Sequence, residues 1–181
     1  MLRIKFLLMN NRKKIPKIGM RIIKSAIAVF LCFVIDDFRN EAGIVFYSLL
    51  SALWCMQAGK KNTIKNAKQR FVGTIFGTVF GFIYIVVKYK ISNSINSNYD
   101  YLAAIMISFI IVAILYTTVL LDKKQASYFS CVVFLSIAVN HIGDMHPYLF
   151  VWNRFLDTAI GIVVGVSVNL LIGNKREVQY D

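Results

Sequence analysis

Long apolar runs alternate with short polar segments along the whole chain. Runs that reach or approach the length of a bilayer crossing occupy about residues 18–35, 42–58, 71–87, 101–121, 126–142 and 148–172. About 20 apolar residues cross the hydrocarbon core as a helix, because a helix satisfies its own backbone hydrogen bonds in lipid. None of the runs alternates like a barrel strand. The pattern predicts an all-α membrane protein with six transmembrane helices, and the fifth run (SYFSCVVFLSIAV at its core) is the weakest.

One short phrase occurs twice. Residues 70–81 read RFVGTIFGTVFG and residues 154–165 read RFLDTAIGIVVG, which share the frame R-F-x-x-T-x-x-G-x-x-x-G at a distance of 84 residues. Three predicted helices separate the copies, so the copies face opposite sides of the membrane. Many transporters use such 3+3 inverted repeats, and we predict one here. The alternative is coincidence between two glycine-rich helices.

The phrase places small residues at intervals of four, which puts them on one helix face. These are Gly73, Gly77, Gly81, Gly161 and Gly165. Small residues let two backbones approach closely, so we predict that the third and sixth helices pack closely, near the core of a symmetric dimer. Asp157 replaces the first glycine of the second copy and should therefore face protein. Arg154 lies three residues earlier and is the predicted ion-pair partner of Asp157.

The charge distribution orients the helices. The chain of 181 residues is 57% hydrophobic and carries a net charge of +12. Of its 21 basic residues, 17 fall in segments that the six-helix pattern places on one side, among them KKNTIKNAKQR, which is expected as a loop between the second and third helices. They are Arg3, Lys5, Arg12, Lys13, Lys14, Lys17, Arg21, Lys24, Lys60, Lys61, Lys65, Lys68, Arg70, Lys123, Lys124, Lys175 and Arg176. Lysine and arginine mark the cytoplasmic side, so this topology accounts for the charge and no nucleic-acid partner is expected.

The predicted protein is therefore a multi-pass protein of the plasma or inner membrane with both termini in the cytoplasm. Residues 1–17 form a basic tail, residues 18–172 the transmembrane domain, and residues 173–181 a short tail with no cytosolic domain after it. The bilayer itself is the first expected partner.

Ionisable residues inside or beside the spans are the candidates for a substrate pathway, because they are costly in lipid. Arg21, Lys24 and Arg70 lie at the predicted inner mouth, and Arg154 and Asp157 lie near the outer one. The alternative for all five is anchoring. Arg154 in particular follows an aromatic belt and could snorkel to water.

Other chemistry finds little support. The segment HIGDMHP holds His141, Asp144 and His146, a weak metal signal without partners nearby, and an intramembrane metal-dependent enzyme is an alternative that rests on it alone. There is no phosphate-binding G-x-x-x-x-G-K and no nucleophile–base pair. Three cysteines lie singly in apolar runs as small hydrophobic residues: Cys32, Cys55 and Cys131. We expect no enzyme activity, no cofactor and no bound metal.

Three segments resemble a known family: IGMRIIKSAIAVFL, ALWCMQAGKKNTIKNAKQRFVGTIFGTVFG and WNRFLDTAIGIVVGVSVNLLI. They are similar to the aromatic acid exporter family member 1 type of FUSC-like membrane proteins, which are related to plant aluminium-activated malate channels. The resemblance covers about residues 18–172. It implies six helices, a homodimer and the movement of organic anions, with aromatic carboxylates as the candidate class.

The predicted function is a transporter or channel that exports small organic anions. An inside-negative potential drives anion exit by about 2.3 kcal/mol per charge per 100 mV, and a basic inner mouth would concentrate the anions. Arg70 and Arg154 are predicted at opposite mouths, with Asp157 holding Arg154 in place. The alternative is a non-transporting membrane scaffold or subunit.

Overall fold

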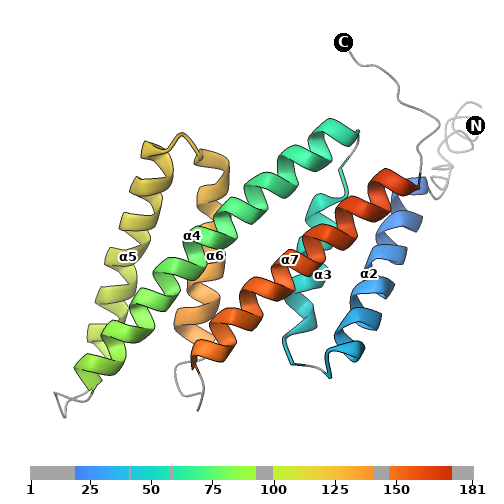
Figure 1. Cartoon of the computed structure of the whole chain (residues 1–181). Helices are drawn as coiled ribbons and strands as arrows, with labels where there is room; N and C mark the ends of the chain where they lie inside the picture. The colour runs from blue at the N-terminus through green and yellow to red at the C-terminus, as the bar shows by residue number, and fades with distance from the viewer. Residues whose placement is uncertain (1–18, 41, 58, 93–99, 141–146, 173–181) are drawn as a thin grey trace, which may run out of the picture.

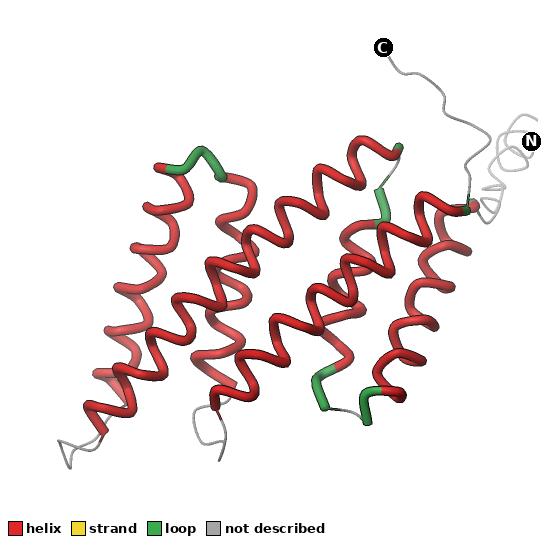
Figure 2. Tube along the Cα trace, in the orientation of Figure 1, coloured by secondary structure: helices red, strands yellow, loops and turns green. Residues whose placement is uncertain are grey.

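The computed structural model describes residues 19–40, 42–57, 59–92, 100–140 and 147–172. It contains six helices in these ranges (Figure 1): α2 (Met20–Phe38), α3 (Val45–Cys55), α4 (Lys60–Ser92), α5 (Asp100–Leu120), α6 (Lys124–Asn140) and α7 (Pro147–Leu171). All regular structure in this part of the chain is helical (Figure 2). The all-α prediction is confirmed. The tails predicted at 1–17 and 173–181 and the candidate metal segment at 141–146 lie outside the described residues.

Three of the helices are long and apolar enough to cross a membrane, within Lys60–Lys90, Tyr101–Leu120 and Pro147–Leu171. The helix that falls shortest is α3 with 11 residues, whereas α6 has 17. The fifth run is short for a crossing, as expected. The second run forms the shorter helix, so the expectation that the fifth would be the weakest of the six is wrong. The second run breaks after Cys55, because the N–H groups of Met56 and Gln57 turn back to the carbonyls of Leu53 and Cys55.

The basic segment KKNTIKNAKQR, expected as a loop, forms the first turns of α4. It contains neither proline nor glycine, and lysine, alanine and glutamine are good helix formers. Its buried Thr63 bonds through Oγ1 to the carbonyl of Gly59 at 3.1 Å. As a result α4 has 33 residues. Arg70 then lies about 15 Å from the start of α4 along the helix axis, and not at the end of the helix where the sequence places it.

The helices pack in a regular pattern of pairs. α4 packs on α6, α7 packs on α3, and α4 and α7 lie side by side across the bundle (Figure 1). α2 contacts α3 and α7, and α5 contacts α6 and α4. One core cluster joins α2, α3 and α7, and another joins α4, α5 and α6. The contacts of α2, α3 and α4 thus correspond to those of α5, α6 and α7. The α3–α7 pair matches the α6–α4 pair, and each of the two core clusters matches the other.

The phrase glycines lie where these pairs touch. A Cβ added at Gly77 would lie 2.6 Å from the Ser130 carbonyl oxygen on α6, and one at Gly165 would lie 2.6 Å from the Ala52 oxygen on α3. α4 and α7 do contact each other as expected, but the glycines face α6 and α3 instead. Four-residue spacing predicts that the glycines share one face of a helix. It does not predict which helix packs against that face.

Candidate functional site

Arg70 is buried inside the bundle. Its Nη2 donates to Ser51 Oγ on α3 at 3.3 Å, and its guanidinium carbon lies 4.7 Å from the centre of the Phe129 ring on α6. Thr74 Oγ1 donates to the Arg70 carbonyl at 2.8 Å. This last bond explains why a threonine stands four residues after the arginine in the repeated phrase.

Arg154 has a closely similar environment. Its Nε donates to Ser136 Oγ on α6 at 2.9 Å, and its Nη1 donates to Thr158 Oγ1 at 2.6 Å. The guanidinium carbon lies over the Tyr47 ring on α3, 3.6 Å from its centre. The side chain is 0% exposed. Arg154 therefore does not snorkel to water within the chain.

The two guanidinium groups lie near each other. Arg70 contacts Ser51, Arg154 contacts Tyr47, and Ser51 Oγ donates to the Tyr47 carbonyl at 2.7 Å. Their contacts on α3 are thus one turn apart, about 6 Å along its axis. Arg70 lies inside the bundle and not at the start of its helix, because α4 begins at Lys60, earlier than predicted. The expectation of one arginine at each mouth of the membrane domain stays a prediction.

Both arginines keep unused hydrogen-bond donors. Nε of Arg70 and Nη2 of Arg154 are buried without a partner. Neither side chain forms an ion pair with a carboxylate among the described residues. An unsatisfied buried donor and an unpaired buried charge are both costly, and the aromatic faces compensate only in part. A bound carboxylate would satisfy the donors and the charge together.

Asp157 pairs elsewhere. Its Oδ1 accepts from Arg39 Nη1 at 2.5 Å, and its Oδ2 accepts from the backbone N–H of Ile44 at 2.9 Å. Asn153 Nδ2 also donates to the Ala42 carbonyl, at 2.6 Å. We call this set of contacts the Asp157 clamp, since it ties the α2–α3 connection to α7. The acid is buried on the glycine face as expected, but its partner is Arg39 and not Arg154.

The remaining two candidates do not join the arginines. Lys24 is buried, and its Nζ lies 3.4 Å from both the backbone and the side-chain oxygen of Asn169. Asn169 stands about 18 Å beyond Asp157 along α7. Arg21 is exposed. Of the five predicted pathway residues, the structure brings together Arg70 and Arg154 only.

With this geometry in place, comparison with known proteins gives one match. The model of the fusaric acid resistance protein-like family matches residues 26–168. The chain belongs to this family. No curated protein and no solved structure matches the chain. The family is one of membrane transport, associated with efflux.

Sequence reasoning missed the residues that surround the arginines in this fusaric acid resistance-like protein. Ser51 and Ser136 are isolated hydroxyls within apolar runs, and Thr158 belongs to the repeated phrase, so each offered a signal. Tyr47 and Phe129 offered none, because an aromatic residue in a membrane span is ordinary. Tertiary packing alone makes them cation partners.

The described residues line two cavities, and both are next to α4. An apolar groove of about 500 Å³ runs between α4 and α7 and is lined by Phe155, Thr78 and neighbouring apolar residues. The other cavity, of about 440 Å³, lies between α4 and the start of α6. Arg70 and Arg154 line neither of them.

Proposed function

We propose that this protein exports small organic anions and that Arg70 and Arg154 form their binding site. The observation that carries the proposal is the pair of buried guanidinium groups, which contact neighbouring turns of α3, each with a free donor and without a carboxylate partner in the described residues. Membership of a family linked to efflux supports the direction of transport. The carboxylate oxygens of a bound anion would supply acceptors to Arg70 Nε and Arg154 Nη2. The rings of Tyr47 and Phe129 beside the arginines favour an aromatic carboxylate, in keeping with an aromatic acid exporter.

We further propose that the two halves form an inverted repeat, and the contacts of the two arginines support it. Each arginine takes a serine from the middle helix of its own half and an aromatic ring from the middle helix of the other half. The first helix of each half ends in the same way, since Asn40 and Asp122 both have φ of 53°. Together with the exchangeable helix pairs, these matches support a two-fold relation that brings both arginines to the middle of the bundle.

The placement of charge supports six crossings with both termini in the cytoplasm. The starts of α2, α4 and α6 and the end of α7 lie at one end of the bundle (Figure 1). The described basic residues at that end are Arg21, Lys24, Lys60, Lys61, Lys65, Lys68, Lys123 and Lys124. In this orientation the plasma-membrane potential drives an anion outward by about 2.3 kcal/mol per charge per 100 mV.

The burial of the site favours a carrier. Arg70 and Arg154 are almost fully buried and line neither described cavity, so an anion reaches them after a movement of the helices. The groove between α4 and α7 is an open apolar surface. We place the homodimer contact there.

Anion flux in proteoliposomes tests the proposal. Arg154→Gln and Arg70→Gln each remove a charged donor and should lower flux about 10- to 100-fold, which corresponds to one charged hydrogen bond. Arg154→Lys should retain part of the flux. Lys90→Gln removes one positive charge at an exposed position near the other end of α4 and serves as the control.

The parent protein and the control must first transport, and the Gln variants must unfold at parent-like temperatures. If Arg154→Gln and Arg70→Gln then carry anions as fast as the parent, the arginines are structural. If no organic anion moves through the parent, the alternative of a non-transporting membrane subunit is favoured.

A further inference from the structure

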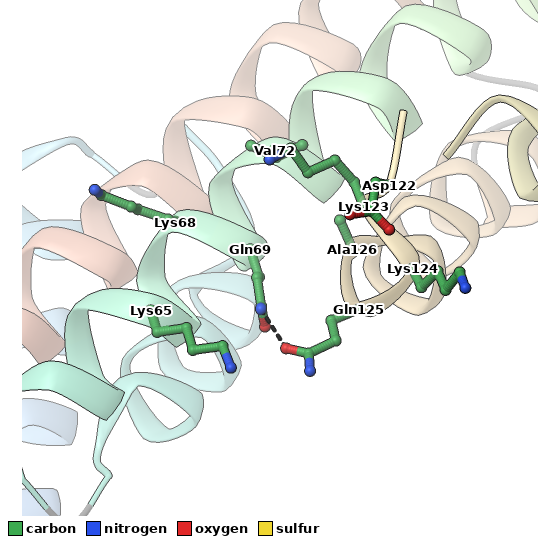
Figure 3. A pocket seen from close by; sticks show the side chains of 9 residues that line it. All are labelled: Lys65, Lys68, Gln69, Val72, Asp122, Lys123, Lys124, Gln125 and Ala126. Atoms are coloured by element: carbon green, nitrogen blue, oxygen red, sulfur yellow. Dashed lines mark hydrogen bonds between the residues drawn. The ribbon is translucent and has the colours of Figure 1, made fainter. Parts of the chain in front are cut away.

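The cavity between α4 and the α5–α6 turn gathers positive charge from two separate elements. Lys65 and Lys68 line it from α4, and Lys123 and Lys124 line it from the turn and the start of α6 (Figure 3). Its volume is about 440 Å³. We call it the lysine cavity. Gln69 Nε2 donates to Gln125 Oε1 and closes one side of it.

The charge of the lysine cavity is not neutralised. None of its four lysines forms an ion pair in the part of the chain that the structure describes, and the cavity holds a single carboxylate, that of Asp122. Positive charges that line a concave surface raise the local concentration of anions. The four lysine side chains are exposed and extend in different directions around the cavity (Figure 3). Turned inward, their ammonium groups would supply many donors to a compact anion with several oxygens, and a phosphate group has this chemistry.

The surroundings of the cavity point to a lipid as the source of that phosphate. The apolar span of α5 ends at Leu120, directly before the turn that carries Lys123. Leu120 and Leu121 are 64% and 56% exposed, and Tyr128 on α6 is 66% exposed. A headgroup in the cavity would therefore have its acyl chains against an exposed apolar surface.

We propose that the lysine cavity binds the phosphate headgroup of an anionic phospholipid. The cytoplasmic leaflet follows from the proposed orientation, and basic pockets between helices on that side bind such headgroups. A bound headgroup would join α4 of one half to the α5–α6 turn of the other. Lipid composition would then tune the stability of the contact between α4 and α6.

The test measures the unfolding temperature of the purified full chain in detergent. Dioctanoyl phosphatidylglycerol should raise it in a saturable way, while dioctanoyl phosphatidylcholine should not. Inorganic phosphate and pyrophosphate form a separate arm. A rise with these free anions equal to that with the lipid would overturn the lipid assignment in favour of a soluble phosphate compound.

Paired variants locate the effect. Lys65→Gln with Lys68→Gln, and separately Lys123→Gln with Lys124→Gln, should each weaken the apparent lipid affinity by roughly 30-fold. The matched control is Lys60→Gln with Lys61→Gln, two exposed lysines of α4 that do not line the cavity. The control should change the affinity by less than about threefold, since its lysines stand outside the site.

Equal losses in the control and the cavity variants would overturn the proposal, because the lysines would then act as a diffuse basic surface. Absence of any lipid-dependent rise in the parent would do the same. These measurements involve no transport, so their outcome is independent of the anion flux assay on Arg70 and Arg154.

Discussion

The Asp157 clamp and the lysine cavity occupy corresponding places in the two halves of the bundle. In the clamp, the α2–α3 connection meets α7 through Asp157 and Asn153. At the cavity, the α5–α6 turn meets α4 near Gln69. The spacing of the repeated phrase aligns Asp157 with Gly73. One end therefore holds a buried carboxylate paired with its cation. The other holds four lysines and the exposed carboxylate of Asp122, with no ion pair among them in the described residues.

At both ends a glycine allows two elements to pack closely. At the lysine cavity the glycine lies on the long helix, and at the clamp it lies on the connection that packs against the helix. A Cβ at Gly73 would lie 2.6 Å from Phe129 Cβ and 2.8 Å from the Ala126 oxygen, so α6 rests directly on α4 there. At the clamp the glycine is on the connection instead, because a Cβ at Gly43 would collide with the Asp157 carboxylate. The clamp thus fixes its end with an internal ion pair. The lysine cavity leaves its end open to an external anion.

Removal of the clamp carboxylate should have the largest effect on stability. Asp157→Asn leaves the Arg39 guanidinium without its ion-pair partner. Removal of one partner of a buried ion pair costs about 3–5 kcal/mol. We expect about 3 kcal/mol here, because the Arg39 side chain is 21% exposed. Asp122→Asn at the corresponding turn should cost less than about 1 kcal/mol. Unfolding in detergent by denaturant measures both. Equal costs would mean that the two ends are held alike.

The glycine contacts should come next. Gly161→Ala forces a Cβ onto the Ser48 backbone of α3, and Gly77→Ala forces one onto Ser130 and Val133 of α6. Overpacking of this kind costs about 1–3 kcal/mol. The control is Gly19→Ala, because nothing lies within 4 Å of a Cβ there. Thermal unfolding and the yield of folded protein are the readouts, and parent-like values for both variants would show that the helices can separate freely.

These contacts indicate how far sequence reasoning reaches in this chain. Apolar runs predicted the helices, and four-residue spacing placed Asp157 and the glycines on buried faces, because both patterns depend on local geometry. The partner of Asp157 was not accessible in this way. Arg39 is 118 positions away, and a rule for neighbours on one helix could propose only Arg154.

The same limit explains the two arginines. The matching phrases that contain both arginines are visible in the sequence. How deep Arg70 lies in the bundle depends on where α4 begins, and a lysine-rich segment at that point predicts a loop. Because α4 begins at Lys60, Arg70 lies far enough along the helix to contact Ser51 on α3. Ser51 is one turn from Tyr47, which contacts Arg154. Helix ends and tertiary neighbours decided the site, and neither follows from periodicity.

The smallest expected effect concerns the amide contacts at the two ends. Asn153 donates to the Ala42 carbonyl at 2.6 Å near the surface, so Asn153→Ala should cost about 0.5–1 kcal/mol. The corresponding Gln69→Ala breaks a bond between two flexible side chains, and the change should stay within about 0.5 kcal/mol. Combination with Asp157→Asn sharpens the comparison. Asn153 and Asp157 hold the same connection, so their effects should be coupled by at least about 0.5 kcal/mol, while those of Gln69 and Asp157 should add. Unfolding of the single and double variants gives both coupling energies, and full additivity of Asn153→Ala with Asp157→Asn would show that the clamp is not a single unit.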